Sequence, residues 1–294
     1  MILSWLKAAR LPSQSYILTP LVLGLSIAQA QGGNLKFEIL ICLAIYSLCL
    51  QLYIIFANDY ADQETDALNE TFTLFSGGSR VLVTGERNPK EIRNAALLSM
   101  SLCIALSLYF SLASQSFLPF VLTILSLLLL FFYSYAPVKL SYRGGGEFLQ
   151  MLGVGLVLPY YSFFLCQGNS YPWELLFVLL PLNLSCGIAT SLPDQPSDKI
   201  SNKKTIAVSF GPLAAKLILM FCEVVSLVSI YILFPAVSQT LLLGHILLFA
   251  IIALQLLCSN GIPGKLRLSV FVFLSILFNL SVQVWLILFF FQVT

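Results

Sequence analysis

The stretch IIFANDYADQETDALNE, residues 54–70, starts as an apolar helix suited to lipid and ends among carboxylates. At about 100° per residue, Asp59, Asp62 and Asp66 fall on one face of that helix, next to Asn58. Like charges on one face repel, and the negative end of the helix dipole adds to the repulsion. A bound cation would offset both effects, and oxygen-only ligands favour a hard ion, Mg²⁺ or Ca²⁺. For this stretch taken alone, a solvated acidic helix end is the alternative.

The composition of the chain indicates that lipid is its main solvent. Of the 294 residues, 59% are hydrophobic and 10% are charged, whereas soluble globular proteins carry about 25% charged residues. Such a chain has too few charges to cover a water-exposed surface. The net charge of only +2 argues against nucleic acid as a partner.

Nine stretches reach the length of about 20 apolar residues that a membrane helix needs. They are residues 14–31, 38–57, 93–113, 117–136, 147–167, 173–191, 213–234, 238–258 and 269–291. Stretches this long and continuously apolar exclude a barrel. The sequence therefore predicts an all-α membrane protein, a bundle of nine transmembrane helices around a central cavity open to lipid. We expect cytoplasmic loop helices to cap the site, and residues 1–294 to form a single domain.

The basic residues determine the predicted orientation. Following nine crossings from the N-terminus places fourteen of the fifteen Lys and Arg residues on one side, all but Lys36. The positive-inside rule makes that side cytoplasmic. We expect an integral, multi-pass membrane protein, in the inner membrane if the source is bacterial. Its N-terminus and its polar site would face the cytoplasm, and its C-terminus would lie outside.

A second acidic segment, SLPDQPSDKISNKKTIAVSFG at residues 191–211, follows the sixth predicted span. Asp194 and Asp198 are spaced i, i+4, and Lys203 follows them. Pro193 is predicted to occupy the first turn of a short helix, where its missing N–H does no harm. Two acidic segments facing each other across the bundle, with basic residues nearby, suit a complex of Mg²⁺ with phosphate.

Two further segments carry features of anion binding. GGSR at residues 77–80 combines glycines, which let the backbone approach an anion, with Arg80, which can bind phosphate in a bidentate manner. Lys139 and Arg143 lie between tyrosines in YSYAPVKLSYRGGGE, residues 133–147. An ordinary flexible loop is the alternative for the first segment, and ordinary positive-inside flanking residues are the alternative for the second.

These motifs resemble those of the UbiA-type intramembrane aromatic prenyltransferases. Residues 58–66 are similar to the family's N-D-x-x-D-x-x-x-D motif, and Asp-x-x-x-Asp at 194–198 is similar to its second aspartate motif. Within the family the chain most resembles the branch that prenylates 1,4-dihydroxy-2-naphthoate. The segments that carry this resemblance are GGSRVLV at 77–83, YRGGGE at 142–147 and KKTIAVSFG at 203–211.

The resemblance implies a Mg²⁺-dependent enzyme that moves a polyprenyl or phytyl-like group from its diphosphate to an aromatic acceptor in quinone biosynthesis. The catalytic aspartates that it implies are Asp59, Asp62, Asp194 and Asp198. The Mg²⁺ ligands that it implies are Asp59, Asp62, Asp66, Asp194 and Asp198. The diphosphate-binding residues that it implies are Asn58, Arg80, Lys139, Arg143 and Lys203. The acceptor would be 1,4-dihydroxy-2-naphthoate, in the menaquinone or phylloquinone pathway.

Several alternatives stay open. Residues 190–193 read TSLP where that branch usually has Asn-Asn-x-Arg, so 4-hydroxybenzoate and homogentisate are alternative acceptors. A terpene cyclase of the same family would ionise the same donor without an acceptor. An ion-coupled transporter belongs to a different class, and its coupling site would lie near the bilayer midplane rather than at one rim. A CDP-alcohol phosphotransferase would need a D-G-x-x-A-R pattern, which this sequence lacks.

Overall fold

The structure, a computed structural model, describes residues 2–34, 36–73, 76–235 and 238–293. These residues form helices and loops, with one isolated bridge between Thr73 and Ser76. The prediction of an all-helical protein is therefore confirmed over the described chain.

The bundle is built from helices of very different lengths. They are α2 (Ser15–Gln29), α3 (Phe37–Ala67), α4 (Pro89–Ser114), α5 (Leu118–Ser134), α7 (Gly146–Leu152), α8 (Leu158–Leu165), α9 (Leu176–Ser191), α12 (Pro212–Leu233), α13 (Gln239–Leu257) and α14 (Leu266–Val293). Short helices flank the polar loops. They are α1 (Ile2–Ala9), α6 (Leu140–Arg143), α10 (Gln195–Ile200) and α11 (Ile206–Ser209).

Eight helical stretches of the described chain are long and apolar enough to cross a membrane. They are Ile2–Gln29, Phe37–Ala67, Pro89–Ser114, Gly146–Leu165, Trp173–Ser191, Pro212–Leu233, Gln239–Leu257 and Leu266–Gln292. The helix α5 is also apolar but shorter, at 17 residues. The protein is therefore a multi-pass membrane protein, whereas the count of nine crossings stays a prediction.

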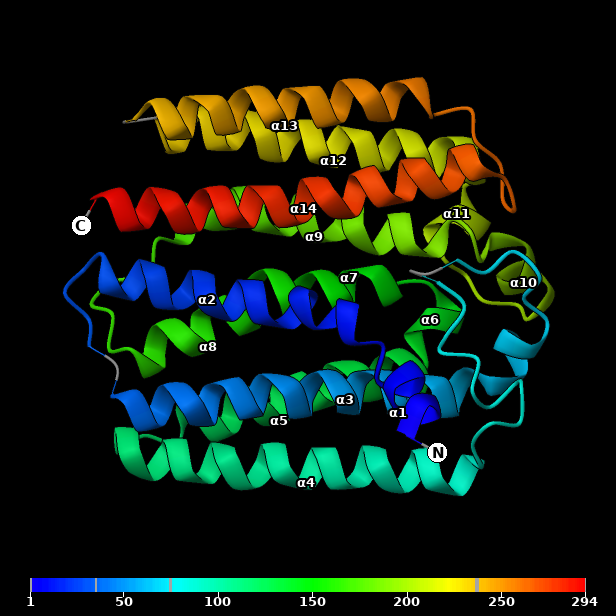
Figure 1. Ribbon diagram of the computed structural model, residues 1–294, viewed down its shortest axis with the longest axis horizontal. Helices are drawn as coiled ribbons and strands as arrows, with labels where there is room; N and C mark the ends of the chain where they lie inside the picture. Colours follow the sequence, from blue (N-terminus) through cyan, green and yellow to red (C-terminus); the bar gives the residue numbers. More distant parts are fainter. Residues whose placement is uncertain (1, 35, 74–75, 236–237, 294) are drawn as a thin grey trace.

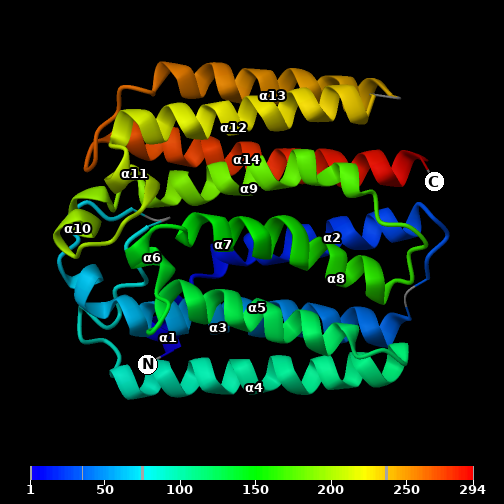
Figure 2. The same cartoon turned by 180° about the vertical axis from the view of Figure 1, so that it is seen from behind.

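The bundle helices lie side by side with their axes roughly aligned (Figure 1, Figure 2). The helix α4 lies at one edge and α13 at the other, while α3 packs on α4, α2 on α8, and α9 on α12. The short helices α6, α10 and α11 gather at one end of the bundle, and the C-terminus lies at the other end. The polar loops thus share one end, as predicted, although the side of a membrane that this end faces stays a prediction.

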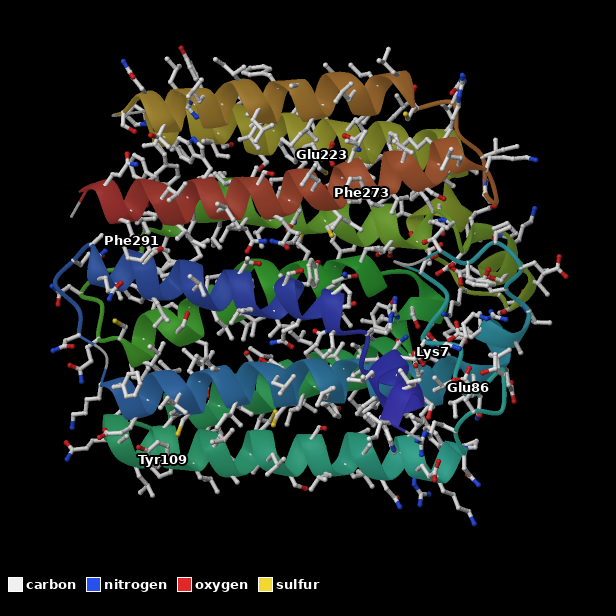
Figure 3. The ribbon with its side chains drawn as sticks, in the orientation of Figure 1. Lys7, Glu86, Tyr109, Glu223, Phe273 and Phe291 are labelled. Carbon is white, nitrogen blue, oxygen red and sulfur yellow. The ribbon has the colours of Figure 1, made fainter. Side chains whose placement is uncertain are left out.

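Apolar side chains cover much of the outer surface. Leu112 on α4 is 80% exposed and Leu243 on α13 is 65% exposed. Tyr109 and Phe291, labelled in Figure 3, are exposed as well. So much exposed apolar area is untypical of a soluble monomer and matches a surface that lipid solvates.

The helix α3 continues past the predicted end of its span, residue 57, as far as Ala67. The first acidic motif is therefore helical throughout. Asp59 and Asp62 are buried on the inner side of this extension, whereas Glu64 is exposed. The extension carries the motif from the apolar bundle into the polar end of the molecule.

The span predicted at 147–167 is not one regular helix. A π-helical turn, Gly153–Val157, separates α7 from α8. Pro159 offers no N–H to the carbonyl one turn before it, which disrupts the regular ladder of hydrogen bonds here. A Cβ on Gly155 would lie 2.9 Å from the Leu179 carbonyl oxygen. The interruption therefore lets this backbone pack directly against α9.

The prediction for Pro193 is wrong. The helix α10 begins at Gln195 with Asp194 as the preceding cap residue, so Pro196 lies in the first turn instead. A proline is tolerated there because the first N–H groups of a helix have no helical partner. The Pro193 carbonyl accepts a hydrogen bond from the Thr71 hydroxyl, at 2.6 Å.

Candidate active site

The loop after α3 folds back over the first acidic motif. Asp59 accepts hydrogen bonds from the backbone N–H of Ser79, at 3.2 Å from Oδ2, and from the Ser79 hydroxyl. The backbone at Gly77 and Gly78 has φ of 77° and 68°, in the left-handed region that favours glycine. A Cβ on Gly78 would lie 2.1 Å from Asp66 Oδ2. The close approach of loop and motif therefore requires glycine at position 78.

The same loop holds the second acidic motif. Asp194 Oδ1 accepts a hydrogen bond from Asn69 Nδ2 at 2.7 Å, and Asp194 Oδ2 accepts one from the backbone N–H of Gly77 at 3.0 Å. Asn69 and Asp194 are 125 residues apart in the chain. The two acidic segments therefore meet at one end of the bundle, as the sequence predicts.

Lys203 lies between the two motifs. Its ammonium nitrogen is 2.8 Å from Asp62 Oδ2 and 3.7 Å from Asp198 Oδ1. Lys203 is 8% exposed, and both carboxylates are buried. Since buried charges are costly unless they are paired, this contact stabilises one acid from each motif.

Burial determines the acid–base behaviour of the second motif. It raises the pKa of the Asp198 carboxyl to about 7, although nearby Lys203 opposes the shift. Burial also raises the pKa of Asp194, against its hydrogen bonds from Asn69 and Gly77. For Lys203, burial lowers the pKa, but Asp62 and other anionic neighbours more than offset this, and the pKa is raised. Lys203 is therefore charged at neutral pH, whereas Asp198 titrates near pH 7.

A polar pocket of about 130 Å³ lies between the motifs. Six of the predicted site residues line it, namely Asn58, Asp62, Asp66, Asp194, Asp198 and Lys203. Arg10, Tyr133, Glu147, Gly187 and Thr190 also line it. Asp59 is not among the lining residues, because its carboxylate is turned toward Ser79.

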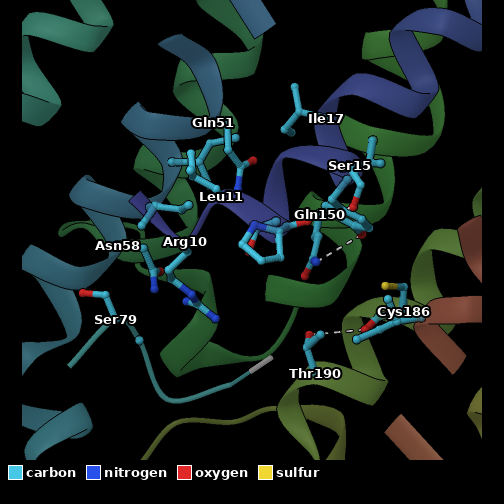
Figure 4. A pocket seen from close by; sticks show the side chains of 18 of the residues that line it. Arg10, Leu11, Ser15, Ile17, Gln51, Asn58, Ser79, Gln150, Cys186 and Thr190 are labelled. Atoms are coloured by element: carbon cyan, nitrogen blue, oxygen red, sulfur yellow. Dashed lines mark hydrogen bonds between the residues drawn. The ribbon is translucent and has the colours of Figure 1, made fainter. Parts of the chain in front are cut away.

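A larger, mainly apolar cavity of about 1140 Å³ adjoins the polar pocket. Five residues line both spaces, namely Arg10, Asn58, Gly78, Tyr133 and Thr190. The wall of the larger cavity comes mainly from α2, α3, α5, α7, α9 and α14, with further residues from α1, α8 and the loop after α3, and Figure 4 shows part of it. The predicted central cavity is therefore present, and the acidic motifs lie at its polar end.

The chain matches the UbiA prenyltransferase family over residues 17–277. It belongs to this family. Over 220 residues it is 26% identical to the 1,4-dihydroxy-2-naphthoate octaprenyltransferase of Bacillus subtilis (strain 168), an alignment covering 71% of this chain and 68% of the relative. The family and the prenyltransferase activity predicted from the sequence are therefore confirmed.

Solved structures of UbiA homologs share the fold. The homolog from Archaeoglobus fulgidus bound to GPP and Mg²⁺ has a TM-score of 0.70 at 18% identity, covering 99% of both chains. The apo homolog from Aeropyrum pernix K1 has a TM-score of 0.66 at 15% identity, covering 90% of this chain and 97% of the homolog.

Arg80 of this UbiA-family chain does not point into the polar pocket. Its guanidinium donates to the carbonyl oxygens of Asp66 and Asn69, at 2.8 and 3.0 Å, and lies over the Phe72 ring. These contacts hold the end of α3 and the loop after it. Arg80 therefore supports the acidic motif from outside the polar pocket, and it lines the larger cavity.

Lys139 and Arg143 line neither of the two cavities. The Lys139 ammonium is 3.6 Å from the centroid of the Tyr142 ring, and Arg143 is exposed. The Tyr142 hydroxyl donates to Asp62 Oδ1 at 3.3 Å. This segment therefore contacts the acidic motif through Tyr142, whereas its two cations lie farther out.

Sequence reasoning missed Arg10 and Glu147 as residues of the polar pocket. Arg10 has φ of 43° at the end of α1, and Figure 4 shows it beside Asn58. In the sequence, Arg10 is one of many basic residues at the predicted rim, and nothing distinguishes it from the others. Glu147 accepts a hydrogen bond from the backbone N–H of Ile206 at 2.8 Å. Its position directly after a glycine run was the available signal.

The donors around the polar pocket suit a hard divalent cation. They are carboxylate and amide oxygens, and Lys203 shows that the space between Asp62 and Asp198 favours positive charge. Within the described ranges, no three acidic, His or Cys side chains are close enough to hold a metal ion by themselves.

Proposed function

We propose that this prenyltransferase transfers a polyprenyl group from its diphosphate to 1,4-dihydroxy-2-naphthoate in a Mg²⁺-dependent reaction, with residues 1–294 acting as one domain. The observation that carries the proposal is the junction of a small acidic pocket with a large apolar cavity. A metal-bound diphosphate suits the first space and an isoprenoid tail suits the second.

The comparisons support each substrate separately. The Bacillus subtilis relative, a 1,4-dihydroxy-2-naphthoate octaprenyltransferase, supports a naphthoate acceptor. The Archaeoglobus fulgidus homolog, solved with GPP and Mg²⁺ and with DMAPP and Mg²⁺, supports a prenyl diphosphate and a divalent metal.

In the proposed site, both acidic motifs would hold Mg²⁺, and cationic side chains would bind phosphate oxygens. The proposed metal ligands are Asp59, Asp62, Asp66, Asp194 and Asp198, and Asp59 would have to turn from Ser79 toward the pocket to bind the metal. When bound, the metal would supply positive charge to a leaving group that is poor while fully charged. Lys203 and Arg10 both line the polar pocket, where they would bind the diphosphate, and Asn58 lines both cavities. Arg80 acts indirectly, because it holds the end of α3.

The proposed chemistry begins when the allylic C–O bond breaks and its electron pair leaves with the diphosphate. Lys203 and Arg10 stabilise the negative charge that develops there. The ring of Tyr133, which lines both cavities, stabilises the allylic cation. An electron-rich ring carbon of the acceptor forms the new C–C bond, and its hydrogen leaves as a proton to the released diphosphate. Enclosure in the bundle keeps water from quenching the cation.

The test uses purified protein, mixed prenyl diphosphates and three acceptors: 1,4-dihydroxy-2-naphthoate, 4-hydroxybenzoate and homogentisate. We expect mass spectrometry to show prenylated naphthoate with Mg²⁺, and no product after chelation. A product with only another acceptor would replace the naphthoate assignment. A hydrocarbon formed without any acceptor would indicate a terpene cyclase, and the absence of diphosphate release under every condition would overturn the proposal.

A further inference from the structure

A polar patch interrupts the apolar wall of the larger cavity, close to the polar pocket. It consists of Tyr16 on α2, Gln150 on α7, and Cys186 and Thr190 on α9. Figure 4 shows Gln150, Cys186 and Thr190 together on one side of the cavity. A hydrocarbon tail forms no hydrogen bonds, so this polar patch points to a polar part of the second substrate.

Gln150 is held in one orientation by its neighbours. Its Nε2 donates to the Tyr16 hydroxyl oxygen at 3.1 Å. Its Oε1 lies toward α9, where a Cβ on Gly187 would be only 3.1 Å away. Glycine at position 187 therefore makes room for the amide oxygen. Gly187 lines the polar pocket and Gln150 lines the larger cavity, so this contact joins one residue of each space.

This amide oxygen has free hydrogen-bonding capacity. Over the part of the chain that the structure describes, no group donates a hydrogen bond to Gln150 Oε1. The amide nitrogen is bonded to Tyr16, which leaves the oxygen as the end of the amide that can accept a further hydrogen bond. The polar patch therefore offers one oriented acceptor, which suits a ligand hydroxyl.

The position of Gln150 matches the place where the acceptor ring must react. Glu147, three residues earlier on α7, lines the polar pocket, and this spacing corresponds to about 4.5 Å along a helix axis. A ring carbon in attack position lies about 3–3.5 Å beyond the reacting carbon of the donor. A ring placed to attack a diphosphate ester in the polar pocket is therefore level with Gln150.

We propose that Gln150 Oε1 accepts a hydrogen bond from a ring hydroxyl of the aromatic acceptor, with Tyr16 as a positioning residue. This inference rests on the proposed function and names the group that recognises the acceptor. As the new C–C bond forms, electron density leaves the ring and its hydroxyl becomes more acidic, so the hydrogen bond to Oε1 strengthens. Gln150 thereby selects hydroxylated aromatics over the corresponding ethers.

The experiment compares 1,4-dihydroxy-2-naphthoate with its two monomethyl ethers in wild type, Gln150→Leu and Tyr16→Phe. We expect wild type to prefer the diol over one of the ethers by about tenfold or more in kcat/KM, because a site built to bind a hydroxyl rejects an analogue without the donor. Gln150→Leu should lose this preference by lowering kcat/KM for the diol alone. The donor KM should stay within about twofold, which a general structural defect would not allow.

Tyr16→Phe keeps the amide but removes the group that orients it, so the preference should fall by a smaller factor. The matched control is Gln239→Leu, the same exchange at an exposed position at the start of α13, and it should behave as wild type. A wild-type preference retained in Gln150→Leu overturns the inference. If Gln150→Leu does not fold, an unchanged preference in Tyr16→Phe overturns it. If the wild-type protein prenylates no hydroxylated aromatic, the proposed function is wrong, whatever the variants do.

Discussion

Two aspartates from opposite halves of the chain depend on one short loop. Asp59 accepts a hydrogen bond from Ser79, and Asp194 accepts one from Gly77. Alanine at either position removes a proposed metal ligand and leaves these loop N–H groups without their partner.

We expect Asp59→Ala and Asp194→Ala to lose prenyl transfer by about a hundredfold or more, because the charge on the leaving group is no longer offset. Both variants should remain extractable as folded protein in detergent. Product formation is measured by mass spectrometry beside Glu64→Ala, an exposed acid on the same helix that should keep wild-type activity. Near-normal turnover in either aspartate variant would refute the metal assignment.

Burial raises the pKa of Asp198 to about 7, which predicts a pH-dependent metal requirement. Mg²⁺ binds the deprotonated carboxylate, so protons compete with the metal as the pH falls below that pKa. The Mg²⁺ concentration for half-maximal activity should rise about tenfold between pH 8 and pH 6, the factor for one competing proton. Between pH 8 and pH 9 it should stay constant. If the Mg²⁺ concentration for half-maximal activity is the same at pH 6 and pH 8, this role of Asp198 is contradicted.

At the scale of elements, the need for glycine at position 78, in the loop after α3, can be tested with Gly85 of the same loop as the control. Gly78 and Gly85 both have positive φ, 68° and 70°, so alanine strains the backbone similarly at each. A Cβ on Gly78 collides with the Asp66 carboxylate, whereas a Cβ on Gly85 meets nothing within 4 Å. Gly78→Ala should therefore lower turnover by about tenfold or more, while Gly85→Ala should stay active. Equal activities would mean that the loop does not need its close contact with α3.

A buried acid joins three helices in the other half of the bundle. Glu223 on α12 is fully buried and accepts hydrogen bonds from Ser275 on α14, at 2.6 Å, and from Gln255 on α13, at 3.4 Å (Figure 3). Glu223→Ala should leave both donors unpaired and lower the thermal unfolding midpoint of the solubilised protein by several degrees. Glu174→Ala, at an exposed site, should leave it unchanged. An unaltered midpoint for Glu223→Ala would show that these bonds contribute nothing.

Apolar length and charge distribution predict the helices well, because lipid permits few alternatives to a helix. The meeting of the two acidic motifs was also predictable, since mutually repelling carboxylates need a shared cation. The π-helical turn before Pro159 and the first-turn role of Pro196 were not, because both depend on packing between helices. The proposed role of Gln150 was not predictable either, because it depends on contacts with Tyr16 and Gly187, which lie on other helices.

At the scale of the whole molecule, the apolar cavity should limit the length of the prenyl chain. Leu280 lies midway along α14 and lines this cavity. Leu280→Trp adds bulk there, so the preferred donor should shift to a shorter chain without loss of the acidic site. Competition among prenyl diphosphates of increasing length measures the shift, and Leu288→Trp, on the exposed side of the same helix, is the control. An unchanged preference would show that the tail takes another path.

The ion pairs of Lys203 also bear on how the protein is made. The two acidic segments lie far apart in the sequence and must come together as the chain folds. Lys203, 2.8 Å from Asp62 and 3.7 Å from Asp198, supplies a positive charge that reduces the repulsion between the two segments. The two halves of the newly made chain can therefore close on each other without waiting for an ion from the surroundings.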